Sequence, residues 1–257
     1  MNKLLTTTLA ATTLALATHA AFAEDQVREN RPVDAKVTRI RLGGVVTLNV
    51  HQGATPSLVI SGGKSLVART TTTQHGDTLD IGNESESHFS WHSDSDKLVA
   101  DLTVPNLQEF SASGVGNSTV TGFSGDKVRV SMDGAGSLTM NSRYRVVDAA
   151  LGGVGGVTLN NGGTADRVDL SLRGAGRMTI TGETKVLHGT LSGVGSLDAT
   201  NLRADSVELR MSGMGSANVF ARSAANLNLS GLGSASVYGN PATRNAATSG
   251  MGKVSWK

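Results

Sequence analysis

Apolar and polar residues alternate along most of the chain with a period of two, and from Ser113 onward the alternation repeats about every 20 residues. Each repeat is centred on a Gly-x-Gly element, and successive first glycines are 20, 19, 21, 19, 20, 18 and 19 residues apart. The eight copies begin at Gly114, Gly134, Gly153, Gly174, Gly193, Gly213, Gly231 and Gly250. So constant a spacing indicates a solenoid, in which each unit buries its apolar face against its neighbours.

Four columns of the aligned repeats are apolar: the positions four and two before the first glycine, and two and four after the second. The exceptions are Ser118, Gly189 and Thr248. Polar residues such as Thr119 stand between the columns, which is typical of half-buried strands, and no helical stripe is present. We therefore expect an all-β fold, a parallel β-helix. The columns from Leu138 to Val254 and from Met140 to Trp256 should face its core.

The sequence leaves open how many Gly-x-Gly motifs each turn of the solenoid contains, because a second, weaker repeat has twice the period. Similar short segments recur about every 40 residues, at 125–128, 165–168 and 204–207. Either successive turns alternate in loop chemistry, which gives about eight thin turns, or one turn holds two motifs, which gives about four wide ones. We favour thin turns, since about 20 residues is an ordinary solenoid repeat.

The middle residue of the motif has two interpretations. On a straight strand its parity is opposite to that of the buried columns, so the side chains would form an exposed apolar ridge. If Gly-x-Gly is a corner, the same side chain can point inward, and we favour this interpretation. The column contains Val115, Ala135, Val154, Ala175, Val194, Met214, Leu232 and Met251.

The domain organisation follows from where the repeat stops. Residues 36–110 carry less regular strands, and we expect them to cap the N-terminal end of the solenoid, because an uncovered end exposes unpaired strand groups. Residues 111–257 carry the regular repeats, so that 36–257 is a single β-helix domain. We expect residues 24–35 to be a flexible leader.

The first 23 residues have the features of a signal peptide. Lys3 precedes a short apolar stretch, Leu4 to Ala17, and Ala21-Phe22-Ala23 forms a cleavage site. We therefore expect export, with cleavage after Ala23, to the periplasm or the extracellular space. No later stretch is long and apolar enough to cross a membrane.

Composition narrows the chemistry. The chain has no cysteine, which excludes disulfides, thiolate metal sites and a cysteine nucleophile. Its formal charge of +2 and its lack of a Lys/Arg cluster argue against nucleic-acid binding. Asp126, Asp166 and Asp205 share a column, but we assign them to turns, where Asp bonds its local backbone, rather than to catalysis. We assign no catalytic, cofactor-binding or metal-binding residue.

One segment, 84–96, has an alternative interpretation as a metal site. If it is extended, six side chains with metal-ligand chemistry fall on one face: Glu84, Glu86, His88, His92, Asp94 and Asp96. No established ligand spacing is present, so we favour a polar hairpin loop.

The sequence resembles the GIN domain family, whose members are described as heads of autotransporter adhesins. The resemblance rests on the recurring Ser-Gly-x-Gly of 192–195, 212–215, 230–233 and 249–252, and on the ending 237–241. It covers roughly residues 36–256 and implies a right-handed parallel β-helix outside the cytoplasm, with no catalytic residues. The middle residue of the family motif is usually Ser or Ala, whereas six of the eight here are Val, Leu or Met.

We interpret the chain as an exported, non-enzymatic β-helix, an adhesin-like interaction module of the cell envelope without a cofactor. Its partner is an envelope glycan, another protein or a second copy of itself. The alternatives are a carbohydrate-active β-helix enzyme, which would require grouped acidic residues, and a structural or envelope-stress protein of the periplasm.

Overall fold

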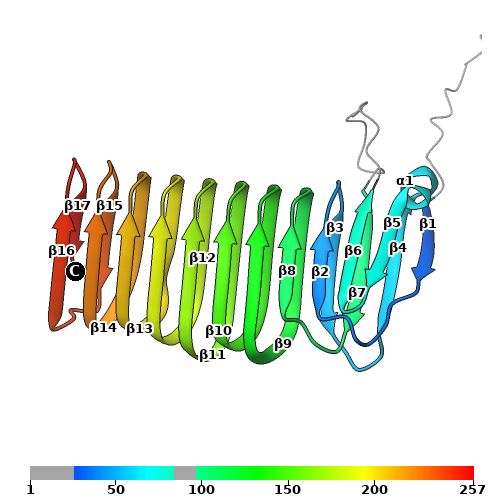
Figure 1. Cartoon of the computed structure of the whole chain (residues 1–257), viewed down its shortest axis with the longest axis horizontal. Coiled ribbons are helices and arrows are strands. Elements are labelled where there is room, and N and C mark those ends of the chain that lie inside the picture. The colour runs from blue at the N-terminus through cyan, green and yellow to red at the C-terminus, as the bar shows by residue number, and fades with distance from the viewer. Residues whose placement is uncertain (1–25, 84–96) are drawn as a thin grey trace, which may run out of the picture.

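The computed structural model describes residues 26–83 and 97–257, and most of them lie in strands. Figure 1 shows the strands stacked side by side along one axis, as a solenoid of about seven turns. The helix among these residues, α1 (Lys64–Ala68), is a single short turn near the N-terminal end. The predicted parallel β-helix is therefore confirmed.

The regular part of the solenoid consists of long strands that each run through a whole turn. They are β9 (Val115–Met132), β10 (Ala135–Leu151), β11 (Val154–Leu172), β12 (Ala175–Leu191), β13 (Val194–Met211) and β14 (Met214–Leu229). Each pairs in parallel with the next, and Ala135 of β10 lies opposite both Val115 of β9 and Val154 of β11. One turn therefore contains one Gly-x-Gly motif, which confirms the thin turns.

Each long strand bends once, so that the solenoid has two faces and two edges. The first face is the half-turn that follows Gly-x-Gly, and the second face is the half-turn that precedes the next motif. Register shifts, such as the one between Asn141 and Arg143, mark the bend between the faces. We call this bend the broad edge and the Gly-x-Gly bend the narrow edge; the narrow edge is at the top of Figure 1.

The N-terminal turns stack out of sequence order. The strands β2 (Arg39–Leu42) and β3 (Thr47–Gln52) form one turn, and β6 (Thr78–Asn83) and β7 (Val99–Val104) form another. β2 pairs in parallel with β6 on one side and with β8 (Glu109–Ala112) on the other. β3 likewise lies between β7 and β9. The turn that comes first in the sequence is thus the middle one in space.

Antiparallel strands close the N-terminal end. β4 (Ser57–Gly63) pairs with β7, β1 (Gln26–Arg31) pairs with β4, and β5 (Thr70–His75) pairs with β6. The expected cap is therefore present, but it begins before residue 36. The expectation of a flexible leader over residues 24–35 is wrong for 26–31, because these residues pair along their whole length with β4.

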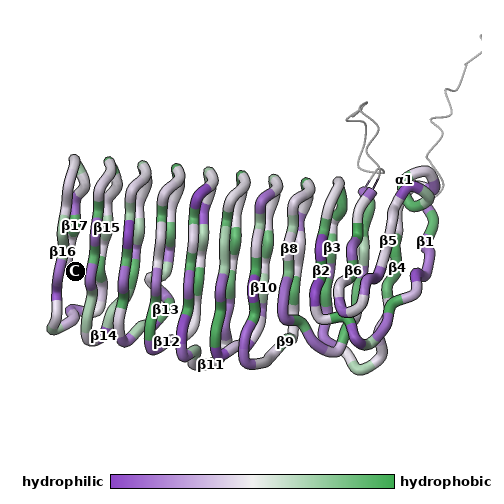
Figure 2. Tube along the Cα trace, in the orientation of Figure 1, coloured by the Kyte–Doolittle hydropathy of each residue, from purple (hydrophilic) through white to green (hydrophobic). Residues whose placement is uncertain are grey.

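The core lies between the two faces, and the predicted columns line it. Leu138, Met140 and Leu151 are each at most 1% exposed, and Figure 2 shows hydrophobic and hydrophilic positions following one another along the middle turns. The exceptions are Ala112, which is half-buried, and residues of the last turn, formed by β15 (Ser234–Tyr238), β16 (Thr243–Thr248) and β17 (Lys253–Trp256). Val254 and Trp256 are half-buried and not buried as predicted, because no further turn covers them.

Candidate interaction surfaces

The middle residues of Gly-x-Gly lie in a line on the narrow edge and point to solvent. Val115, Val154 and Val194 are 52%, 62% and 55% exposed, and Met251 is 80% exposed. We call this line the apolar ridge; it contains Val45, Val115, Ala135, Val154, Ala175, Val194, Met214, Leu232 and Met251. Since neighbouring strands lie about 4.8 Å apart, its nine residues span about 38 Å.

Close stacking of the backbone explains why glycines flank the middle residues of the motif. A Cβ atom built on Gly134 would lie 1.9 Å from the carbonyl oxygen of Gly114, in the turn before it. The amide between the glycines takes part in the same stacking, since Val154 N donates to Gly134 O at 3.0 Å. The glycine positions therefore have no room for a side chain between neighbouring turns. Because the middle residues are exposed, the favoured interpretation, a corner with inward side chains, is wrong.

Val45 belongs to the apolar ridge, although the repeat pattern did not indicate it. It is bridged to Val115 and is 38% exposed. It follows Gly43 and Gly44, but Val46 stands where the motif has its second glycine. The Gly-Gly-Val segment at 43–45 is the sequence feature that could have indicated this position.

The aspartates of the broad edge form ion pairs from turn to turn. Arg145 lies between Asp126, at 3.4 Å, and Asp166, at 2.7 Å, and Lys185 reaches Asp166 from the other side at 2.7 Å. Arg222 similarly joins Glu183 and Asp205, at 3.1 and 3.3 Å. The three aspartates thus bridge turns through cations, instead of making the local backbone bonds that we expected.

These ion pairs bear on the chemistry of the broad edge. Hydrogen bonds from Lys185 and then from Arg145 lower the pKa of the Asp166 carboxyl below its ordinary value. The same contacts raise the pKa of Arg145. A general acid needs a carboxyl that keeps its proton near neutral pH, whereas this one is held ionised. The geometry favours a charged ladder between turns.

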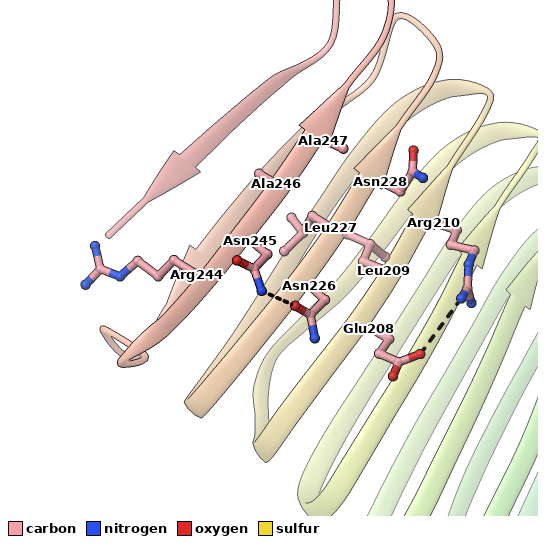
Figure 3. A pocket seen from close by; sticks show the side chains of 10 residues that line it. All are labelled: Glu208, Leu209, Arg210, Asn226, Leu227, Asn228, Arg244, Asn245, Ala246 and Ala247. Atoms are coloured by element: carbon pink, nitrogen blue, oxygen red, sulfur yellow. Dashed lines mark hydrogen bonds and ion pairs between the residues drawn. The ribbon is translucent and has the colours of Figure 1, made fainter.

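The second face carries a separate row of polar groups. His188 lies between two carboxylates, with its Nδ1 3.0 Å from Asp169 and its Nε2 3.6 Å from Glu208. Towards the C-terminus the row continues in amides, and Asn245 donates to Asn226 at 2.8 Å. Figure 3 shows the shallow hollow around Asn226, Asn228 and Asn245 at this end of the second face.

The possible metal site over 84–96 lies outside the described residues. Within 26–83 and 97–257, no group of three or more His, Asp or Glu side chains is arranged to hold a metal ion. Among the described residues, the candidate sites are three surfaces: the apolar ridge, the ladder of ion pairs and the end of the second face.

Residues 36–241 match the family described as "Putative auto-transporter adhesin, head GIN domain". The match spans most of the chain. The chain belongs to the GIN domain family. Among solved structures, a protein from Parabacteroides merdae described as a "putative adhesin" superposes with a TM-score of 0.77 at 18% identity, covering 90% of this chain and 96% of the other.

Two further structures share the fold. One from Parabacteroides distasonis, described as a "putative lipid binding protein", gives a TM-score of 0.79 at 16% identity, covering 91% of this GIN domain chain and 97% of its own. A "putative adhesin" from the same species gives 0.77 at 19% identity, with coverages of 91% and 98%. No curated protein matches the sequence. Within the described part of the chain, no helix is long and apolar enough to cross a membrane.

Proposed function

We propose that this GIN domain is an exported, non-enzymatic, adhesin-like binding module of the cell envelope, and that the apolar ridge is its binding surface. The family and its structural relatives support an adhesin-like role. The signal-peptide pattern of residues 1–23 supports export. The observation that carries the proposal is the exposure of seven large apolar side chains in one row.

The shape of the apolar ridge favours an extended polypeptide segment as the partner. A row about 38 Å long and one residue wide matches an extended segment of about 12 residues, at about 3.3 Å per residue. Glycines flank every ridge residue except Val45, which is followed by Val46, so the ridge itself offers a partner apolar contact and no charge. A strip one residue wide buries less area than a standard interface, which covers about 800 Å² on each partner. The expected contact is therefore weak, and suits adhesion by many copies at once.

The test replaces two adjacent ridge residues, Met214→Ser with Leu232→Ser. A phage library of random 12-residue peptides is selected on the immobilised chain that begins at Glu24. The selected peptides should bind the double variant at least tenfold more weakly, because each lost apolar contact costs about 1 kcal/mol or more. The melting temperature should stay unchanged, since both side chains are more than half exposed.

The matched control is Ser216→Ala with Ser234→Ala, two residues further along the same two turns. It should bind the selected peptides as the unaltered chain does. Equal binding of the peptides to the ridge variant would place their site elsewhere, and a lower melting temperature of that variant would show that the ridge serves stability. Failure to select any peptide would contradict the proposal.

A further inference from the structure

The C-terminal end of the solenoid is built differently from the N-terminal end. β16 pairs with β14 and β17 pairs with β15, and neither has a second partner among the described residues. All six residues of β16 are exposed, including Ala246 and Thr248, whose columns are buried from β9 to β14. We call this end the terminal face; it comprises Arg244, Met251, Lys253, Trp256 and Lys257.

Two residues of the terminal face occupy inward columns and lie across the open end. Arg244 is in register with buried Ala225, and Trp256 with buried Val237. The guanidinium of Arg244 lies 5.7 Å from the centre of the Trp256 ring, and its Nε donates to the Pro241 carbonyl at 2.9 Å. Figure 3 shows Arg244 extending away from the hollow and past the last strand. A charge in an inward column opposes the addition of another strand.

The side-chain charges of this end are all positive. No Asp or Glu follows Glu208 in the sequence. Arg210 and Arg222 have carboxylate partners in earlier positions, at 4.0 Å for Glu208 and 3.3 Å for Asp205. The three cations of the terminal face, Arg244, Lys253 and Lys257, form no ion pair with the described residues. Lys257 lies over the ring of Tyr238 at 5.8 Å.

Exposed apolar groups accompany these cations. Met251, the last residue of the apolar ridge, is 80% exposed, and the Trp256 ring is half-buried at the open end. Unpaired cations beside Trp and an exposed aliphatic side chain are the combination that binds the headgroup layer of an anionic bilayer. A soluble polyanion would use the cations but not Met251.

We propose that the terminal face docks on an anionic phospholipid surface. Arg244, Lys253 and Lys257 contact the phosphates, while Trp256 and Met251 enter the interface. The unpaired backbone groups of β16 and β17 keep the end within the hydrated headgroup layer, because strand edges are not tolerated in hydrocarbon. The apolar ridge then runs away from the membrane. This inference does not depend on the proposed partner of the ridge.

The experiment uses the chain that begins at Glu24 with Trp91→Phe, which leaves Trp256 as the one tryptophan of the two in the sequence. Sedimentation with vesicles of phosphatidylcholine, and of phosphatidylcholine with phosphatidylglycerol, gives the partition coefficient. Binding should require phosphatidylglycerol, shift the Trp256 emission to shorter wavelength and weaken with salt. Lys253→Gln with Lys257→Gln should lower the partition coefficient about 25-fold, because each cation near the surface contributes about fivefold.

The matched control removes two exposed lysines elsewhere, by Lys64→Gln with Lys127→Gln, and should bind as the unaltered chain does. Equal loss in both double variants would mean that net charge alone drives binding, which overturns the proposal. Equal binding to both vesicle types would overturn it as well. Binding to soluble polyphosphate as strong as binding to the vesicles, with no shift in the Trp256 emission, would also overturn the proposal. A dimer that forms through the terminal face and prevents vesicle binding would overturn it too.

Discussion

Single glycines decide how closely the turns of this solenoid approach each other. A Cβ atom at Gly174 would lie 1.9 Å from the carbonyl oxygen of Gly153, whereas the nearest atom to a Cβ at Gly163 is 3.8 Å away. The first contact involves backbone on both sides, so no side-chain rotation relieves it. At Gly136 a φ of +145° adds a second reason for glycine. The narrow edge therefore depends on glycine for space and at some turns for backbone conformation.

The variants Gly174→Ala and Gly163→Ala should separate these roles. Gly174→Ala should lower the free energy of unfolding by at least 1–3 kcal/mol, as overpacking does. Gly163→Ala should change it little, or raise it by about 0.4–1 kcal/mol by restricting the unfolded chain. Urea unfolding of the two proteins measures the difference. Equal stabilities would mean that neighbouring turns move apart without cost.

A buried amide performs a local task that the repeat pattern does not reveal. The side chain of Asn161 accepts a hydrogen bond from Tyr144 N at 2.8 Å and donates to Tyr144 O at 3.1 Å. It thereby replaces ladder bonds where the register of β10 and β11 shifts. The Tyr144 hydroxyl donates to Leu107 O at 2.6 Å, and burial raises the pKa of Tyr144.

At the scale of the element, alternation decides which side chains enter the core. On β11, Leu170 is 3% exposed, while the adjacent Ser171 is half-buried on the second face. The side chain of Leu170 stacks in register between Ala149 and Gly189 of the neighbouring turns. The same strand thus offers two positions with the same backbone and opposite surroundings.

Leu170→Asp should destabilise the protein by several kcal/mol, because it buries a carboxylate without a partner. Ser171→Asp should leave the melting temperature close to that of the unaltered protein, because the new carboxylate faces solvent. Circular dichroism melts of both variants make the comparison. Overlapping melts for Leu170→Asp and the unaltered chain would show that this column does not face the core.

At the scale of the whole molecule, the two ends of the solenoid differ. The N-terminal end is closed by antiparallel strands, and β4 there has partners on both sides, β1 and β7. The C-terminal end is open, and its last strands have a partner on one side alone. Because each turn contacts mainly its neighbours, local stability should follow this asymmetry.

Hydrogen exchange measured by mass spectrometry should therefore show a gradient. Peptides within 135–211 should exchange most slowly, because their turns are covered on both sides. Peptides within 243–257 should exchange first among the strands, and peptides within 57–63 should be better protected than these. Uniform exchange along the chain would indicate that the molecule opens only as a whole.

The class of fold, the length of a turn and the buried columns could all be predicted from the residues of the repeat. Alternation with a period of two shows which residues of a strand share a face. A repeat of constant length can bury its apolar face only by stacking on its neighbours. The same logic predicted that Leu138 and Met140 are buried, because each has a turn on both sides. It failed at Val254 and Trp256, since a column continues to the end of the repeats although its covering turn does not.

The tertiary structure decided what depends on distances between turns. Strand parity gave the outward direction of Val115 and its equivalents, but the sequence left open whether the chain turns at Gly-x-Gly, because that depends on how the glycine backbones of neighbouring turns stack. The place of β2 and β3 between later strands, and the pairing of β1 with β4, are contacts between distant segments with no periodic signal. The sequence also does not reveal that Arg244, Lys253 and Lys257 lie on one face, because the stacking of the turns determines which residues form the end of the solenoid.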